Sequence, residues 1–377
     1  MQRYDAVIVG GGPAGSATAI ELARSGARVV LVDRATFPRD KPCGGGLTTR
    51  AFARCPVDPT PVVEDEVDLV ELRFRYGDKV VRHAHAPVIR MTQRRRLDAF
   101  LLGAARSAGV EVREGARVDA VEGATVVAGG ERLAADVVVG ADGANGVCAR
   151  ALGFGIGIVH GVALEGNVAY DALDRPHYEH RAVVELADIP GGYAWVFPKA
   201  DHVNVGVGAW AREGKRLRDH LARLCDAHGI PLGSVRGVVG HRLPLRRPGT
   251  AVAGERALLV GDAAGLIDPV SGDGMYECFV SARLAAEEVR ALLDGRVSTL
   301  AGYTTSLDAA LGPLHRASWS LKHALDRWPR LSWRIARTEL LWRSVERLLL
   351  GELAAPREAH GVARVPLRLL DALGRSG

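Results

Sequence analysis

The stretch that decides the fold is VIVGGGPAG, residues 7–15. It closes a short apolar run, residues 4–9, of the kind that forms a buried strand. A helical pattern follows and ends at Gly26, and residues 28–32 form a second apolar run. A strand, a glycine-rich turn, a helix and a strand in this order predict a β-α-β unit.

The spacing of the glycines predicts a dinucleotide site. Gly10 permits a tight turn, Gly12 lets a pyrophosphate approach the backbone, and Gly15 allows close packing of helix on strand. The start of the helix offers N–H donors and positive potential to the phosphates. Asp33 lies 18 residues after Gly15, where a carboxylate can bind the ribose hydroxyls and disfavours a 2′-phosphate. At this point the dinucleotide can be FAD or NAD, and the expected ligands are Gly10, Gly12, Pro13, Ala14, Gly15, Asp33 and Arg34.

Length and composition indicate an enzyme-sized globular protein. The chain has 377 residues, of which 47% are hydrophobic, enough for two joined domains. The formal net charge is +5, but charges are mixed evenly over the first 300 residues, so we expect no nucleic-acid partner. The chain opens without a signal-peptide pattern, and no apolar run approaches the ~20 residues of a spanning helix. Five cysteines without a C-x-x-C pair suit a reducing compartment, so we expect a cytoplasmic location and no metal site.

Two later segments indicate FAD. GADGANGVCAR (residues 140–150) and LLVGDAAGLIDPVSGDG (residues 258–274) resemble the second and third fingerprints of the para-hydroxybenzoate hydroxylase-like (group A) FAD-dependent enzymes. The resemblance implies that a helix beginning near residue 274 faces the isoalloxazine, where its N-terminus stabilises the anionic reduced flavin. No second glycine fingerprint follows a strand, so electrons are expected from transiently bound NAD(P)H or from a ferredoxin acting as redox partner. The resemblance adds these expected FAD ligands: Arg94, Val118, Asp142, Gly143, Gly261, Asp262, Pro269, Gly272, Gly274 and Met275.

The fold implied is α/β (α+β): a Rossmann-type FAD-binding domain interleaved with an antiparallel β-sheet substrate domain, followed by a helical C-terminal region. Alternating strands from about residue 155 to 244 support the second domain. The expected boundaries are residues 1–75, 91–152 and 245–300 for FAD binding, 76–90 and 153–244 for substrate binding, and 301–377 for the helical region.

Three further motifs narrow the family. PCGGGL (residues 42–47), PGGYAWVFPK (residues 190–199) and SGDGMY (residues 271–276) are similar to segments of the geranylgeranyl reductases. The resemblance implies that the enzyme saturates C=C bonds of a prenyl chain in an isoprenoid or lipid-like substrate. Reduced flavin N5 would deliver a hydride to one carbon, and a proton would reach the other. Such a chain needs an apolar tunnel beside the flavin.

The same motifs supply the expected substrate and catalytic residues. Tyr193, Trp195 and Phe197 alternate along one strand and share a face, which is either the wall of that tunnel or the core of the sheet. Cys43 either shapes the pocket, relays a proton or is a spectator thiol. If the glycines let the flavin approach the backbone, Gly45→Val should weaken flavin binding far more than the fold. The expected catalytic residues are Cys43, Tyr193 and Trp195; Cys43, Gly44 and Gly45 are also expected to contact the cofactor; the expected substrate contacts are Gly45, Gly46, Leu47, Tyr193, Trp195 and Phe197.

The C-terminal region is rich in tryptophan and arginine. Residues 315–347 hold eight basic residues against three acids, and four of the six tryptophans. This composition suits helices at a membrane interface, which would give peripheral membrane contact. The alternative is a helical cap whose indoles pack on the tunnel.

Other functions fit parts of the pattern. An FAD-dependent monooxygenase, hydroxylating or epoxidising an apolar or aromatic metabolite, has the same fold. Gly146 and Ala149 replace a serine and an arginine of the hydroxylase fingerprint, which weakens that alternative. A flavin halogenase would have W-x-W-x-I-P where this chain has YAWVFP, and a non-catalytic flavoprotein or lipid carrier is the alternative outside catalysis.

Overall fold

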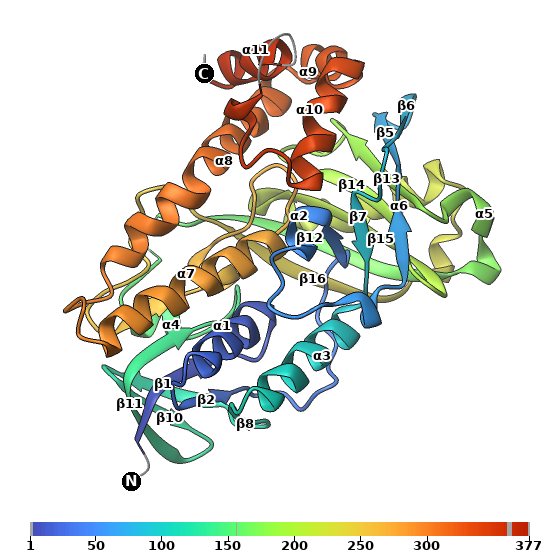
Figure 1. The fold of residues 1–377 in the computed structure, drawn as a ribbon. Coiled ribbons are helices and arrows are strands. Elements are labelled where there is room, and N and C mark those ends of the chain that lie inside the picture. The colour runs from blue at the N-terminus through green and yellow to red at the C-terminus, as the bar shows by residue number, and fades with distance from the viewer. Residues whose placement is uncertain (1–2, 156, 360–363, 376–377) are drawn as a thin grey trace.

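Two large sheets and a helical cap make up the fold (Figure 1). The computed structural model describes residues 3–155, 157–359 and 364–375. The N-terminal sheet lies at the bottom of Figure 1, and the second sheet lies at the upper right. The last helices sit at the top, over the second sheet. The mixed α/β class and the helical C-terminal region match the sequence prediction.

The first sheet has seven strands in the order β8-β2-β1-β11-β10-β9, and β17 also pairs with β11. The pairs β1–β2, β1–β11, β2–β8 and β11–β17 are parallel, as a β-α-β unit requires, and β9 and β10 add antiparallel pairs. The strands are β1 (Arg3–Val9), β2 (Val29–Val32), β8 (Glu111–Arg113), β9 (Val118–Glu122), β10 (Thr125–Ala128), β11 (Glu131–Gly140) and β17 (Ala257–Leu259).

Helices cover this sheet because its strands are apolar on both faces. All four residues of β2 are buried, which explains why it reads as a continuous apolar run. Helices α1 (Pro13–Arg24), α3 (Arg94–Ser107) and α7 (Met275–Leu293) pack together above the sheet. Short helices α2 (Thr49–Phe52) and α4 (Cys148–Ala151) lie in the connections.

The second sheet also has seven strands, in the order β16-β12-β15-β14-β13-β5-β6. All pairs are antiparallel except β5–β13, which is parallel. Strand β5 places this sheet's first residue at Leu69, ahead of residue 76, where we expected the substrate domain to begin. The strands are β5 (Leu69–Phe74), β6 (Asp78–His83), β12 (Val159–Ala169), β13 (Arg181–Leu186), β14 (Tyr193–Pro198), β15 (His202–Trp210) and β16 (Arg236–Leu245).

The two faces of the second sheet differ. Val203, Val205 and Val207 of β15 pack on one side against α6 (Leu217–Ala227). The other side faces the interior of the molecule, toward the first domain. A small third sheet, with strands β3 (Gly46–Thr48), β4 (Asp65–Val67) and β7 (Ile89–Met91), and a short helix, α5 (Arg175–Tyr178), complete this part.

Four helices form the C-terminal cap, here defined as residues 302–359 and 364–375. They are α8 (Gly302–Arg327), α9 (Pro329–Ala336), α10 (Glu339–Leu350) and α11 (Arg364–Arg375). Pro329 starts α9, because proline fits the first turn of a helix, whereas Pro313 lies inside α8. Among the described residues, no helix is long and apolar enough to cross a membrane.

Candidate active site

The glycine-rich turn between β1 and α1 has the form that a dinucleotide needs. Gly10 has φ +109°, and a Cβ there would lie 2.4 Å from the Ala141 carbonyl oxygen. A Cβ at Gly15 would lie 1.9 Å from the Gly10 carbonyl oxygen, so helix and strand pack through this position. Both glycines are therefore required by the turn itself.

Gly12 differs, because the space beside it is free of backbone. A Cβ there would meet only the guanidinium groups of Arg39 and Arg94, at 3.7 and 3.8 Å. Asp98 holds both arginines: it accepts hydrogen bonds of 2.7 and 2.8 Å from Arg94 and lies 3.0 Å from Arg39. Two cations and the uncapped N-terminus of α1 converge beside an open glycine, which is the environment that a pyrophosphate requires.

Asp33, which follows β2, and Asp142, which follows β11, accept hydrogen bonds from backbone amides of nearby loops. Asp33 accepts the Gly11 and Ala35 amides, at 2.7 and 2.8 Å. Asp142 accepts two amides at the start of α4 with one oxygen, while its buried Oδ1 has no hydrogen-bond partner. Asp142 does not line the cavity described below, although Ala141 and Gly143 on either side of it do, and its carboxylate also raises the pKa of the adjacent Cys148 thiol, after burial.

Asp262 follows β17 and faces the same space. Its carboxylate lies 3.2 Å from Lys41 Nζ. Burial alone would raise the pKa of Asp262, but the charges of Lys41 and other nearby bases outweigh it and lower the pKa. The pKa of His241, next to this pair, falls to about 4 because of burial and then the Lys41 charge. Asp262 is thus an ionised acceptor for hydroxyl groups at neutral pH.

One continuous cavity of about 450 Å³ starts at these groups. It begins beside Gly12 and Asp262, passes the loop of Cys43, and runs along the inner face of the second sheet. It ends among cap residues of α8 to α11. The far part is lined almost wholly by apolar side chains, among them Leu321, Leu325, Ala336, Leu341, Trp342, Val345, Leu349 and Leu370.

The loop of Cys43 is clamped by two buried residues. Glu165 of β12 accepts the Cys43 amide at 2.6 Å. Lys199 donates to the Gly44 carbonyl at 2.6 Å and to the Thr92 carbonyl at 3.0 Å. Burial lowers the pKa of Lys199 to about 8 and raises the pKa of Glu165. The clamp fixes the backbone of the loop, and Cys43 lines the cavity while its Sγ accepts the Gly45 amide at 3.4 Å.

The loop glycines Gly44, Gly45 and Gly46 all line the cavity, and two of them are also packed against protein. Gly45 has φ +71°, and a Cβ there would lie 2.1 Å from the Thr92 oxygen and 2.4 Å from Lys199 Nζ. Gly45→Val would therefore damage the fold of the loop directly, contrary to our expectation. A Cβ at Gly44 would lie 3.0 Å from the Phe197 ring, so this glycine makes room for the aromatic wall.

The aromatic wall consists of Tyr193, Trp195 and Phe197, which all line the cavity. Adjacent ring centroids lie 5.8 and 6.2 Å apart. The Trp195 indole N–H donates to Asn204 at 2.7 Å, and a Cβ at Gly206 would lie 2.1 Å from the indole, so the ring lies flat over that strand. The Tyr193 hydroxyl donates to the Ser271 carbonyl, and burial raises its pKa.

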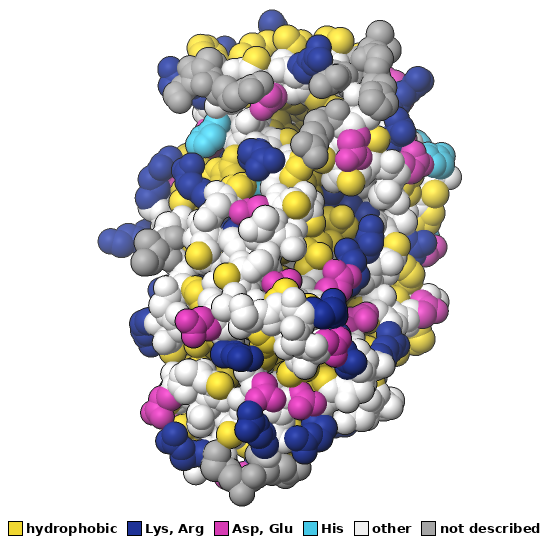
Figure 2. All heavy atoms as spheres, turned by 60° about the vertical axis from the view of Figure 1, so that its left-hand side comes forward, with side chains coloured by type: hydrophobic (Ala, Val, Ile, Leu, Met, Phe, Trp, Pro, Cys, Tyr) yellow, Lys and Arg dark blue, Asp and Glu magenta, His cyan; other side chains and the backbone are white. Residues whose placement is uncertain are grey.

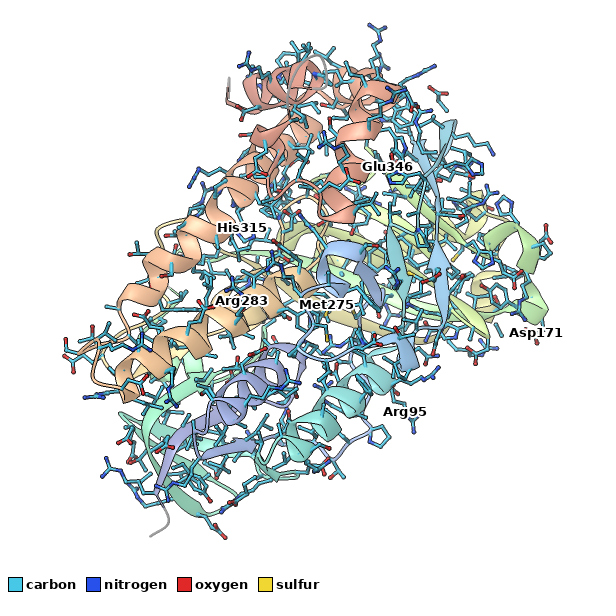
Figure 3. The ribbon with its side chains drawn as sticks, viewed as in Figure 1. Arg95, Asp171, Met275, Arg283, His315 and Glu346 are labelled. Carbon is cyan, nitrogen blue, oxygen red and sulfur yellow. The ribbon has the colours of Figure 1, made fainter. Side chains whose placement is uncertain are left out.

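The helix that the fingerprint implied begins at Met275, the first residue of α7, labelled at the centre of Figure 3. Gly274 precedes it and offers no side-chain cap, but the Met275 amide, the first N–H of α7, donates to Asp273 Oδ1 at 2.8 Å, so the start of α7 lies at the cavity with its first donor already bonded. Gly272, Gly274 and Met275 all line the cavity, as does Gly143.

Other expected site residues lie elsewhere. Arg34 is exposed, Pro269 is buried, and Val118 begins β9 outside the cavity lining. Gly261 is buried, and a Cβ there would lie 2.8 Å from the Ala14 side chain, so it serves packing. Leu47 is buried in a core cluster with Leu97 and Phe279 and does not line the cavity.

Sequence reasoning missed several site residues. Lys199 closes the motif PGGYAWVFPK, so its position was visible although its function was not. Lys41, Glu165 and His241 carry no local signal, because each reaches the site through a contact between distant segments.

Comparison with known proteins shows the family to which the chain belongs. A family model described as an FAD binding domain matches residues 3–300. Geranylgeranyl diphosphate reductase of Oryza sativa subsp. japonica is 34% identical over 315 residues, which cover 76% of this chain and 66% of that protein. Menaquinone reductase of Mycolicibacterium smegmatis is 30% identical over an alignment that covers 96% of this chain and 95% of that protein.

Solved structures share the fold. A geranylgeranyl bacteriochlorophyll reductase-like protein from Thermoplasma acidophilum has a TM-score of 0.84 at 22% identity and covers 98% of this chain and all of its own. The flavin-dependent brominase Bmp2 has a TM-score of 0.79 at 20% identity over the full length of both chains. At these identities the likeness shows the fold alone.

The chain therefore belongs to the FAD binding domain family and is an FAD-dependent oxidoreductase. Within that family it is of the geranylgeranyl reductase type, and FAD is its cofactor.

Proposed function

We propose that the enzyme saturates C=C bonds in the prenyl chain of an isoprenoid or prenylated lipid. The observation that carries this proposal is the apolar cavity that runs from the cofactor end, along the aromatic wall, into the cap. A long flexible hydrocarbon gains free energy by leaving water for such a tunnel, about 0.8 kcal/mol for each buried CH₂ group. Both relatives named above carry names that denote prenylated compounds, which supports the same substrate class.

The chain's own residues would orient the alkene. Trp195, fixed by Asn204, and Phe197 offer flat apolar surfaces on one side of the cavity, and the clamped loop of Cys43 lies beside them. Held between these surfaces, a double bond has its position set before reaction, which is the main contribution that a binding site makes to such a step. We propose that Cys43, Tyr193 and Trp195 contact the reacting alkene.

FAD fits the residues at the near end. The free side of Gly12 with Arg39 and Arg94 would hold the pyrophosphate, and Asp262 would accept from the ribityl or ribose hydroxyls. When bound and reduced, FAD supplies a hydride equivalent for the alkene. We propose NAD(P)H or a ferredoxin as the source of its electrons.

Product mass tests the proposal. The holoenzyme is incubated with a reductant and a panel of prenyl diphosphates, prenylated quinones and prenyl glycerolipids, with and without oxygen. We expect products that gain hydrogen atoms, formed equally well without oxygen. Products that gain oxygen only in air would instead establish the monooxygenase alternative.

We also propose that the cap contacts an anionic membrane, from which a prenyl lipid could enter. Trp328, Leu331, Val365 and Leu369 of the cap are 42–52% exposed. Arg327, Arg330, Arg334 and Arg368 are exposed on the same helices. Figure 2 shows hydrophobic and basic side chains together at the top of the molecule. The other cap tryptophans, Trp319, Trp333 and Trp342, are buried, and of these Trp342 lines the cavity.

Vesicle sedimentation tests this contact. The full chain should bind vesicles that contain phosphatidylglycerol and release them at high salt, because exposed arginines contribute about 1 kcal/mol each near an anionic surface. Trp328→Ser with Leu331→Ser should reduce binding. Val238→Ser with Val239→Ser, which changes two exposed valines of β16, is the matched control. Equal binding by both double variants would contradict the proposal.

A further inference from the structure

A buried polar cluster adjoins the cavity at the start of α7. Its members are Arg50 of α2, Asp273, Glu277 of α7 and His315 of α8. Glu277 is fully buried, His315 is 1% exposed and Arg50 is 7% exposed. Figure 3 labels His315 on α8, above the α7 start marked by Met275.

The cluster leaves many polar atoms unpaired. Among the described residues, fifteen buried side-chain N or O atoms lack a hydrogen-bond partner, and six of them are in this cluster. They are Arg50 Nε and Nη1, Asp273 Oδ2, both oxygens of Glu277, and His315 Nε2. Glu277 Oε1 and His315 Nε2 lie 3.5 Å apart. Since buried polar atoms are rarely left unpaired in native proteins, we expect water molecules to connect these groups.

Asp273 joins the cluster to the cavity. It lines the cavity beside Gly272 and Gly274, and its Oδ1 accepts the Met275 amide at 2.8 Å. Its backbone is held by the turn that Asp268 closes, since the Asp268 amide donates to the Asp273 carbonyl at 2.8 Å. Oδ2 has no such bond and is free to carry a proton. A half-turn about the Cβ–Cγ bond would exchange the two oxygens between the Met275 amide and the unpaired position.

We propose that Asp273 donates the proton in the alkene reduction proposed above, and that Glu277, His315 and Arg50 position it and restore its proton. The inference rests on that proposed function. In the step, the O–H bond of the Asp273 carboxylic acid breaks. The π electrons of the alkene form a new C–H bond at one carbon, and the hydride supplied by the reduced cofactor forms the C–H bond at the other. The cofactor is oxidised by two electrons, the alkene is reduced, and the Asp273 carboxylate regains a proton through the cluster waters.

The surroundings of Asp273 keep it protonated near neutrality. Burial raises its pKa to about 7, with a further contribution from the Glu277 charge. Asp268, in the same loop, acts in the same direction, whereas Arg50 from α2 and the Met275 amide oppose it. Tyr193 faces Asp273 from β14, and His315 faces it through Glu277. An acid that titrates near the working pH is suited to proton donation.

Single-turnover product formation across pH tests the donor. In the wild type, the rate should be constant at low pH and fall as pH rises through about 7, because the carboxylic acid is the active form. Asp273→Asn should be slower by about 10²-fold or more and lose this inflection. Asp273→Glu should restore both, and Asp226→Asn, an exposed carboxylate on α6, should behave as the wild type. Glu277→Gln should move the inflection to lower pH, since it removes a neighbouring negative charge.

A second readout does not depend on turnover. Infrared difference spectra of the oxidised protein should show a protonated carboxyl group that ionises with a midpoint near pH 7. The signal should be absent in Asp273→Asn and present in Asp226→Asn. Persistence of the signal in Asp273→Asn, or an unchanged rate and inflection in that variant, would overturn the role of Asp273. Failure of the wild type to reduce any prenyl compound would instead overturn the proposed function, and the role of Asp273 with it.

Discussion

The length of the cavity should set the length of chain that the enzyme accepts, and Ala336→Trp tests this. Ala336 ends α9 and lines the far part of the cavity, among Leu341 and Leu370 of the cap. An indole at this position would occupy space that the end of a long prenyl chain needs. Because the substitution fills free volume in a cavity of about 450 Å³, it should not lower the Tm.

The magnitude follows from burial. An isoprene unit displaced from the tunnel exposes about five CH₂-sized groups, at about 0.8 kcal/mol each, or about 4 kcal/mol in total. That loss corresponds to about 10³-fold in kcat/KM for the longest chain that fills the tunnel. For a substrate whose prenyl chain is one or two isoprene units shorter, kcat/KM should fall little.

The assay compares kcat/KM for geranyl, farnesyl and geranylgeranyl compounds with the same head group. Ala354→Trp, at an exposed alanine of the cap, is the control. An equal loss for all chain lengths, or no loss for the longest, would refute the assignment of the far cavity to the prenyl chain.

Three further substitutions test other parts of the site. Gly12→Ala keeps an ordinary φ of −75° and its methyl group meets no backbone, so the free energy of unfolding of the apoprotein should stay within about 0.5 kcal/mol of the wild-type value. FAD binding should weaken at least about tenfold. Gly103→Ala is the control, and denaturation and flavin titration measure both variants. Lys199→Met leaves two buried carbonyls unpaired and should destabilise the protein by about 2–4 kcal/mol in urea unfolding, and an unchanged midpoint would show that the clamp does not hold the loop. His241 has a pKa of about 4, below its ordinary 6.5, so its contribution to stability is present above about pH 6.5 and is lost as the pH falls through about 4. His241→Gln should therefore flatten the acid side of the curve of Tm against pH. An acid side identical to that of the wild type would contradict this.

Local patterns made much of the fold predictable. The run VIVGGGPAG specifies a strand, a turn and a helix within one short segment. The close contacts that require Gly10 and Gly15 come from the segment itself and from Ala141 and Asp142, which follow β11. The alternation of Tyr193, Trp195 and Phe197 likewise follows from the two-residue period of a strand. Such features depend on neighbours in sequence, and the structure places them as expected.

What could not be predicted depends on contacts between distant segments. Lys41 and Asp262 pair across 221 residues, and Glu165 reaches the Cys43 amide across 122. Leu47 follows the glycine loop in sequence, yet the small third sheet turns it into the core. Gly45 lines the cavity, but the space that a side chain would need there is taken by Thr92 and Lys199, so the backbone also requires this glycine.

The central claim is that a prenyl alkene takes the electrons held in the active site. The most direct measurement is anaerobic mixing of the dithionite-reduced holoenzyme, freed of excess reductant, with prenyl compounds, while flavin absorbance and product mass are followed. We predict that at least one prenyl compound reoxidises the flavin and gains two hydrogens for each flavin reoxidised. A flavin that stays reduced with every prenyl compound, and that yields oxygenated product once air is admitted, would contradict the account.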